Sequence, residues 1–282
     1  MSPVGKGFPV LYWAAMGGPY THGHHRSVLA SHARRTAANS AAYLLPRLMP
    51  GMDLLDVGCG PGTITVDLAE LVAPGAVVGV DAAPAAVAEA DALRARRGLA
   101  NVSFRVGDVY ALSMDDGSFD VVHAHQVLQH LPNPVGALVE MRRVLRPGGI
   151  LAVRDSDYGG FVWAPDTPEL DAWNSLYHRI TARNGAQANA GRYLLGWVRQ
   201  AGFVDPVATS STWTFADQDS RGWWGESWAE RVEHSAFAEH ALAYGLADRA
   251  ELARIAAGWR RWATSPDGFF AAVHAEVLAR RG

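Results

Sequence analysis

The chain has 282 residues, of which 49% are hydrophobic, and its formal net charge is −3. This charge, without any run of like charges, argues against a protein that neutralises nucleic-acid phosphates. No stretch has the roughly 20 consecutive apolar residues that span a membrane, and the single cysteine, Cys59, excludes an intrachain disulfide. We expect a cytoplasmic protein, monomeric or homodimeric, whose partner is a small molecule.

The first 50 residues are predicted to form an irregular flap followed by a helix. Residues 26–49 have apolar side chains at helical spacing, and Pro46 and Pro50 close that segment. His22, His24 and His25 lie in the flap, but without a nearby cysteine they do not predict a metal site.

Residues 53–65 are the most informative stretch of the chain. An apolar run reaches Asp56, Gly58, Gly60 and Gly62 alternate with other residues, and a helical pattern follows. Glycines allow positive φ angles and close approach of a ligand, and a helix N-terminus offers free N–H groups. Asp81 ends the next apolar run, 19 residues after Gly62. An acid at that distance is placed to bind the two hydroxyls of a ribose.

The same alternation continues to residue 155. A third strand, 102–109, includes Gly107-Asp108, and a fourth strand beginning near residue 118 runs into a helix past His125 and Gln126. A helix, a Pro-Gly-Gly turn at 147–149 and a fifth strand complete the series. Alternating strands and helices predict a parallel sheet covered by helices on both faces.

These motifs, in this order over residues 40–155, closely resemble the class I S-adenosylmethionine-dependent methyltransferases, in the branch that includes the ubiquinone and menaquinone C-methyltransferases. The resemblance implies an α/β fold with a doubly wound, Rossmann-like, mostly parallel sheet of seven strands. It also implies S-adenosylmethionine as cofactor and S-adenosylhomocysteine as product. The residues that it assigns to the cofactor are Asp56, Gly58, Cys59, Gly60, Gly62, Asp81, Ala82, Gly107, Asp108, Val109, His125 and Gln126, with Tyr20 from the flap.

The remainder, 156–282, differs in composition from the cofactor-binding core at 51–155. Nine of the ten tryptophans lie from Trp163 onward. Helices are predicted from Pro168, over 191–201 and over 223–263, and strands over 207–215 and 268–279. By the resemblance, the last two strands form a hairpin at one edge of the sheet, and the inserted helices form a lid over the substrate.

Methyl transfer needs a nucleophile held about 3–3.5 Å from the methyl carbon, and a general base only when that nucleophile arrives protonated. His125 is our candidate for catalysis. The candidates for substrate contact are Tyr20, Asp155, Tyr158 and Trp163, because the carboxyl ends of parallel strands bind ligands. The abundance of tryptophan favours an aromatic or heterocyclic acceptor.

A second resemblance covers some 30 residues near the N-terminus. Tyr20-Thr-x-Gly23, Val28-Leu-x-x-His32 and the segment beginning at Arg35-Thr-Ala-x-Asn39 are similar to small-molecule methyltransferases of fungal and actinobacterial secondary metabolism, some of which act on cyclic dipeptides. It implies that Tyr20 and Arg34 or Arg35 close over the methionine carboxylate.

The expected function is methyl transfer to an N, S, O or C atom of a small metabolite. An NAD-dependent oxidoreductase is the rival enzyme, but Thr63 occupies the position of the last fingerprint glycine, and Asp108 follows Gly107. A non-catalytic protein that binds S-adenosylmethionine is the rival outside enzymes, since an intact binding site does not establish turnover.

Overall fold

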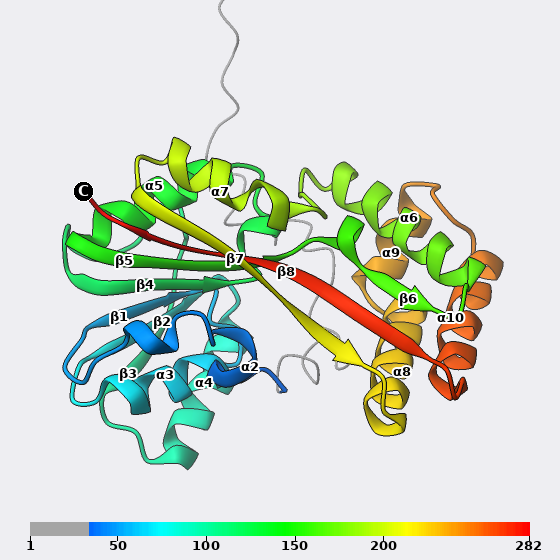
Figure 1. Cartoon of the computed structure of the whole chain (residues 1–282), viewed down its shortest axis with the longest axis horizontal. Coiled ribbons are helices and arrows are strands. Elements are labelled where there is room, and N and C mark those ends of the chain that lie inside the picture. Colours follow the sequence, from blue (N-terminus) through cyan, green and yellow to red (C-terminus); the bar gives the residue numbers. More distant parts are fainter. Residues whose placement is uncertain (1–33) are drawn as a thin grey trace, which may run out of the picture.

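The computed structural model describes residues 34–282 and shows a sheet with helices on both faces, extended at one end by further helices (Figure 1). The strands are β1 (Leu54–Val57), β2 (Val77–Asp81), β3 (Val102–Val106), β4 (Phe119–His125), β5 (Leu145–Ser156), β6 (Val162–Ala164), β7 (Val204–Phe215) and β8 (Phe269–Arg280).

The sheet order begins β3-β2-β1-β4-β5-β8, with β7 on the other edge of β8. The first five strands are parallel, whereas β8 is antiparallel to β5, β6 and β7. The predicted doubly wound, mostly parallel sheet and its terminal hairpin are thus confirmed. The eighth strand, β6, was not predicted, because three residues are too few to show an alternating pattern.

Helices cover the two faces of the sheet in separate groups (Figure 1). One group consists of α2 (Ala37–Ser40), α3 (Thr63–Val72) and α4 (Pro84–Arg97), and the other of α5 (Pro134–Val144) and α7 (Ala190–Gln200). Each group packs against its own apolar core, built around Leu54 and Leu68 on one face and around Val122 and Met141 on the other. Single 3-10 turns occur at η2 (Leu45–Arg47), η3 (Leu128–His130) and η4 (Tyr158–Gly160).

The prediction of a helix over residues 26–49 is wrong for residues 34–49, the part that the structure describes. The chain forms only the four residues of α2 and then the turn η2. Thr36 and Asn39 make reciprocal capping bonds that start α2, and Ala41 leaves helical geometry. Pro46 lacks an N–H group and disfavours helical geometry in the residue before it, so the apolar spacing alone does not sustain a helix.

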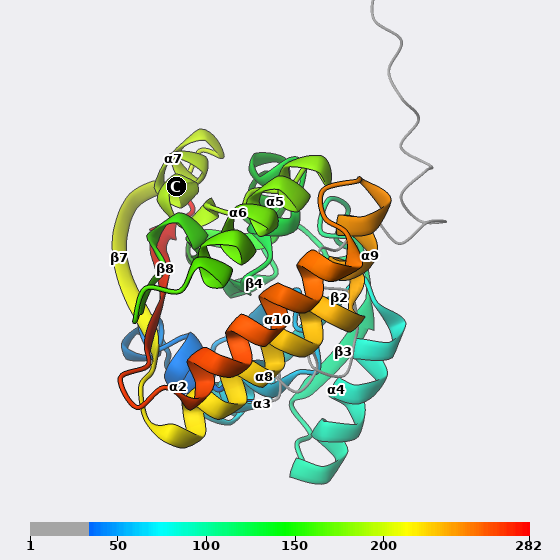
Figure 2. The same ribbon diagram turned by 90° about the vertical axis from the view of Figure 1, so that its right-hand side faces the viewer.

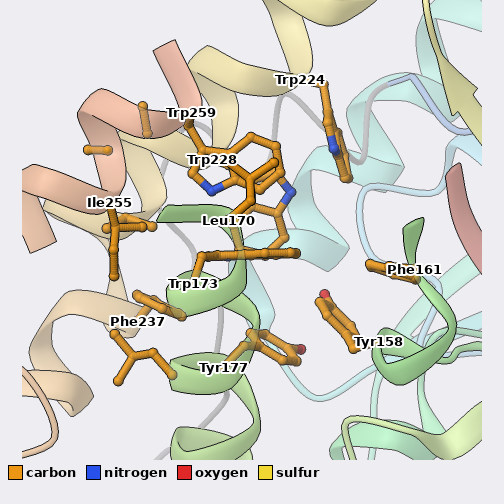
Figure 3. Close-up of a cluster of buried hydrophobic side chains, with 14 of the residues drawn as sticks. Tyr158, Phe161, Leu170, Trp173, Tyr177, Trp224, Trp228, Phe237, Ile255 and Trp259 are labelled. Atoms are coloured by element: carbon orange, nitrogen blue, oxygen red, sulfur yellow. The ribbon is translucent and has the colours of Figure 1, made fainter. Parts of the chain in front are cut away.

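The extension is the predicted helical lid, formed by α6 (Pro168–Arg183), α8 (Gln218–His234), α9 (Ala236–Ala243) and α10 (Arg249–Thr264) (Figures 1 and 2). Its core is rich in aromatic side chains, which make up 11 of the 23 buried residues of this cluster (Figure 3). Trp173 lies at the centre, with the rings of Trp228 and Trp259 at 4.5 and 4.9 Å in edge-to-face contact. Within residues 34–282, no helix is both long and apolar enough to cross a membrane.

Replacing Trp173 with alanine should lower the free energy of unfolding by about 3–5 kcal/mol, because the side chain is fully buried and leaves a large cavity. Trp197→Ala on α7, where the ring is only partly buried, should cost clearly less. Urea denaturation of the two variants measures the difference. Equal losses would show that the aromatic core of the lid does not contribute the expected stability.

Candidate active site

The glycine turn between β1 and α3 requires its glycines. Gly58, Gly60 and Gly62 have φ angles of 68°, 54° and 77°, values that residues other than glycine rarely adopt. A Cβ atom on Gly58 would lie 2.3 Å from Cγ2 of Val127, and one on Gly62 would lie 2.8 Å from Phe104. Packing against Val127 and Phe104 therefore requires glycine at positions 58 and 62 of the turn, which lies at the carboxyl edge of the sheet.

Asp81 connects this turn to the neighbouring strand. Its Oδ2 accepts a hydrogen bond from the Gly60 N–H at 2.9 Å, and its Oδ1 accepts one from the Ala83 N–H at 2.9 Å. The carboxylate is half-buried at the end of β2, beside the turn, as the spacing of the sequence predicts. Ala82 is exposed just beyond it.

The loop that carries Asp108 lies next to Asp81. The Gly107 N–H donates to the Asp81 carbonyl at 3.0 Å, and the exposed Asp108 carboxylate accepts from the Tyr110 N–H at 2.9 Å. No α-helix follows Asp108 before α5, so this acid does not cap one. Val109 is partly buried beside the core of this face.

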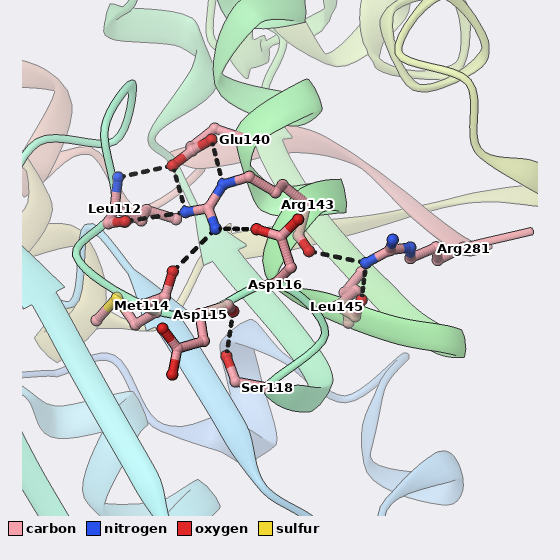
Figure 4. Close-up of polar contacts among 9 residues, drawn as sticks. All are labelled: Leu112, Met114, Asp115, Asp116, Ser118, Glu140, Arg143, Leu145 and Arg281. Atoms are coloured by element: carbon pink, nitrogen blue, oxygen red, sulfur yellow. Dashed lines mark hydrogen bonds and ion pairs between the residues drawn. The ribbon is translucent and has the colours of Figure 1, made fainter.

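A polar network holds the far end of the same loop (Figure 4). Arg143 on α5 donates to the carbonyls of Leu112 and Met114, each at 2.9 Å, and forms an ion pair with Asp116 at 2.6 Å. Glu140 accepts from the Leu112 N–H at 2.8 Å. The loop from Gly107 to the start of β4 is thus tied to α5, which fixes the position of Asp108.

Asp56 and Cys59 face the interior. Asp56 contacts His123 Nδ1 at 2.7 Å and accepts from the Thr65 hydroxyl at 2.5 Å, so both of its carboxylate oxygens already have partners. Burial raises the pKa of the Cys59 thiol, which makes it a packing residue rather than a nucleophile. Their predicted part in the cofactor site stays a prediction, and it would involve their backbone rather than their side chains.

Gln126 follows β4 with a φ of 54°, which is unusual for a residue other than glycine. Its side-chain oxygen accepts from Arg35 at 2.7 Å, and its Nε2 donates to Ser156 at 3.0 Å and lies 2.8 Å from Nε2 of His274. Nδ1 of His274 lies 3.0 Å from the Ala272 carbonyl and so carries the proton, which leaves Nε2 to accept from Gln126. The Gln126 amide is therefore fixed in one orientation.

His125 is buried, and neither of its ring nitrogens has a hydrogen-bond partner among the residues that the structure describes. Burial, followed by the charges of Arg154 and Arg35, lowers its pKa well below the usual value. His125 is thus an uncharged imidazole at neutral pH, able to donate one hydrogen bond and accept another.

Asp155 lies on the opposite face of the sheet and is fully buried. One carboxylate oxygen accepts from the Gln129 N–H at 3.2 Å, and the other has no hydrogen-bond partner in the described part of the chain. Burial raises the pKa of Asp155 to about 8, against the effect of the backbone N–H groups of Gln129 and Leu128. The group is therefore mostly protonated at neutral pH.

Because the pKa of Asp155 is raised on folding, the folded chain retains this proton between about pH 4 and pH 8, whereas the unfolded chain loses it. Stability contributed by the neutral carboxyl should fall as pH rises through that window. Asp155→Asn removes this titratable group. As pH rises, the free energy of unfolding of the variant should therefore increase relative to that of the wild type, by at most about 1.4 kcal/mol per pH unit. Denaturation at pH 5, 6, 7 and 8 tests this, and a pH-independent difference would contradict it.

Two of the other predicted substrate contacts, Tyr158 and Trp163, pack in or against the lid core. Tyr158 is buried in the aromatic core, with its ring stacked on Tyr177 at 3.8 Å. Trp163, on β6, stacks on Phe270 at 5.9 Å. Tyr20 lies outside the described residues.

The structure adds buried polar residues that the sequence analysis missed. Arg154 on β5 and Glu276 on β8 form an ion pair at 3.2 Å, and His274 lies two residues away on the same strand. The sequence signal that could have indicated these residues is a charged or polar side chain inside an otherwise apolar strand. Among residues 34–282, no group of three or more histidine, cysteine or acidic side chains is arranged to hold a metal ion.

Comparison with known proteins assigns the family. A family model described as a methyltransferase domain matches residues 48–202. An uncharacterized methyltransferase of Schizosaccharomyces pombe is 35% identical over 271 residues, 93% of this chain and 96% of that protein. The chain belongs to the methyltransferase domain family. The predicted class I S-adenosylmethionine-dependent methyltransferase is thus confirmed, and with it the enzyme class.

Two further similarities bear on the methyltransferase. Nocamycin O-methyltransferase of Saccharothrix syringae is 45% identical over 101 residues, which make up 36% of each chain. Among solved structures, the 4+2 cyclase SpnF is 26% identical with a TM-score of 0.52, and the match covers 96% of this chain and 91% of that one.

The residues at the carboxyl edge fit S-adenosylmethionine as the methyl donor. The glycine turn leaves no room for a Cβ at Gly58 or Gly62, and the Asp81 carboxylate lies against that turn. These features suit a nucleoside whose ribose hydroxyls bind the Asp81 carboxylate while the rest of the molecule lies along the backbone of the glycine turn.

Proposed function

We propose that the enzyme methylates an N, S, O or C atom of a small aromatic or heterocyclic metabolite of the natural-product type, with cyclic dipeptides among the candidates. The observation that carries this proposal is the lid, whose aromatic core around Trp173 lies beyond the carboxyl edge of the sheet. An apolar, tryptophan-rich body beside this edge suits a flat apolar acceptor better than a sugar or a phosphate. The similarity to nocamycin O-methyltransferase supports the natural-product class.

In this proposal the predicted cofactor residues keep their roles. The glycine turn lines the methionine part, Asp81 with Ala82 binds the ribose, and Asp108 with the Val109 N–H binds the adenine. Gln126 contacts the methionine amine or the acceptor, and Tyr20 closes over them. Support comes from the shared edge of the sheet, where Asp81, the turn and Gly107 are joined by hydrogen bonds.

When bound, the cofactor supplies a methyl group already activated by a positively charged sulfur. The chain then has to orient the acceptor and exclude water. The Gln126 amide, held by Arg35, Ser156 and His274, offers a fixed position at the end of β4. His125 is neutral and buried, so we propose that it orients the acceptor through a hydrogen bond and is a weak base.

The test is incubation of the purified enzyme with S-adenosylmethionine and a panel of phenols, indoles, cyclic dipeptides and acidic heterocycles, followed by mass spectrometry. We expect one panel class to gain a methyl group while S-adenosylhomocysteine forms in equal amount. Calorimetry with NADH should show no binding. Binding of NADH in place of S-adenosylhomocysteine would favour the oxidoreductase.

A second candidate is a protein that binds S-adenosylmethionine without transferring its methyl group. The similarity to SpnF, which is titled a cyclase and matches most of both chains, favours this alternative. Tight binding of S-adenosylhomocysteine without its formation from S-adenosylmethionine, across the whole panel, would support it.

We further propose a cytoplasmic monomer or homodimer that acts without nucleic acid, in keeping with the net charge of −3. Gel filtration and a binding assay with DNA and tRNA at low salt test these points.

A further inference from the structure

A buried polar cluster lies on the sheet face that α2 covers. His125 and Arg154 are register partners on β4 and β5, and Arg154 and Glu276 are register partners on β5 and β8. Direct partners on neighbouring strands project from the same face. Tyr43, just after α2, packs on this face of the sheet with its hydroxyl oxygen buried. Burial raises the pKa of Tyr43 well above its usual value, and the charges of Arg154 and Glu276 act on it in opposite directions.

Three members of the cluster have hydrogen-bonding atoms without a partner among residues 34–282. Arg154 is only 1% exposed and uses Nε and Nη2 toward Glu276 and Ser211, but its Nη1 has no acceptor in this part of the chain. Within the same residues, the Tyr43 hydroxyl and both nitrogens of His125 are also unpartnered. Unpaired buried polar groups cost about 1–3 kcal/mol each, so native structures rarely retain them without a ligand or water.

All three side chains can donate. Arg154 Nη1 and the Tyr43 hydroxyl are donors, and a neutral His125 has one N–H. The acids that face the cluster already have partners, since Glu276 accepts from Arg154, Ser211 and Thr209, and Asp56 is held by His123 and Thr65. After burial itself, the charges that lower the pKa of His125 most are those of Arg154 and Arg35, followed by His274 and His123. Donors in a positive local field are complementary to an oxygen anion.

The cluster also adjoins the predicted position of methyl transfer. His125 is the last residue of β4 and directly precedes Gln126. Its ring lies 5.8 Å from that of Trp213, which the Arg35 and Arg154 guanidinium groups approach at 5.6 and 4.9 Å. A group bound by the cluster would therefore lie next to the edge where the acceptor has to bind.

We propose that Arg154, His125 and Tyr43 form a subsite for an oxygen anion of the methyl acceptor, so that the acceptor class is a carboxylic acid or an acidic enol or phenol. This inference rests on the proposed function, whose acceptor it specifies. An acceptor held as an anion has no proton for the enzyme to remove, which agrees with a site whose histidine is neutral and a weak base.

The test compares benzoate with benzamide, two ligands of similar shape that differ in charge, by calorimetry on enzyme saturated with S-adenosylhomocysteine. We expect benzoate to bind at least tenfold more tightly. Tyr43→Phe should remove most of that preference while leaving the affinity for S-adenosylhomocysteine and the melting temperature unchanged or slightly raised, because the hydroxyl has no partner within residues 34–282. Tyr193→Phe, at an exposed position on α7, is the matched control. Arg154 is not substituted, since its removal would leave Glu276 buried without its ion pair.

Equal binding of benzoate and benzamide, or an unchanged preference in Tyr43→Phe, would overturn the subsite. Failure of the wild type to bind S-adenosylhomocysteine would instead overturn the proposed function. In that case benzoate and benzamide are titrated into the protein without S-adenosylhomocysteine. A preference for benzoate that is lost in Tyr43→Phe would support the subsite, and no preference would overturn it.

Discussion

Replacing Asp81 with alanine should weaken the binding of S-adenosylhomocysteine by about 100-fold, the equivalent of about 3 kcal/mol. Two ribose hydroxyls would lose a charged acceptor, and each hydrogen bond to a charged group contributes about 1.5–3 kcal/mol. The carboxylate also holds the Gly60 and Ala83 N–H groups, so the glycine turn should loosen as well. Calorimetric titration of the wild type and the variant measures the effect.

Two controls separate binding from folding. Asp91→Ala removes an acid whose side chain is 49% exposed on α4 and should leave the affinity unchanged. Asp81→Asn keeps an acceptor for one N–H group and should retain the fold while losing most of the affinity. An Asp81→Ala enzyme that is folded and binds S-adenosylhomocysteine as tightly as the wild type would remove Asp81 from the cofactor site.

Gly58→Ala should lower the free energy of unfolding by about 3 kcal/mol and also abolish cofactor binding. The positive φ costs a residue with a side chain about 1–2 kcal/mol, and the Cβ at 2.3 Å from Val127 adds an overpacking cost of about 1–3 kcal/mol. Urea denaturation and calorimetry measure the two effects.

Gly98→Ala supplies the matched comparison. Gly98 has a φ of 66°, but a Cβ there would have nothing within 4 Å, so this substitution carries the backbone cost alone. Adding Val127→Ala to Gly58→Ala should recover the packing part of the loss. If Gly58→Ala and Gly98→Ala lose the same stability, the contact with Val127 is not the cause.

Much of the core could be predicted from local sequence. The strands ending in Val57 and Asp81 are short apolar runs followed by glycine or an acid, and the glycine turn has a spacing that few other structures require. The lid helices were predictable because segments such as 249–264 carry apolar residues at helical spacing over several turns. Local pattern and tertiary structure agree in these elements.

The residues beside the acceptor could not be predicted in this way. Arg154 and Glu276 are separated by 122 positions and become partners only through the register of β5 and β8. Gln126 has a left-handed backbone with a φ of 54°, which a glutamine in the sequence does not indicate. The apolar spacing of residues 34–49 favoured a long helix, but capping at Thr36 and the proline at position 46 limit helix formation there.

The long antiparallel pair of strands limits how the lid can move. β8 pairs with β5 over one part of its length and with β6 over another, while β7 accompanies it almost throughout. A hinge between sheet and lid would have to break main-chain hydrogen bonds of this ladder, each worth about 0.5–1.5 kcal/mol. Sheet and lid should therefore move together as one rigid body. The rate of product release should not be limited by opening of these helices, in contrast to enzymes whose lids are connected by flexible loops.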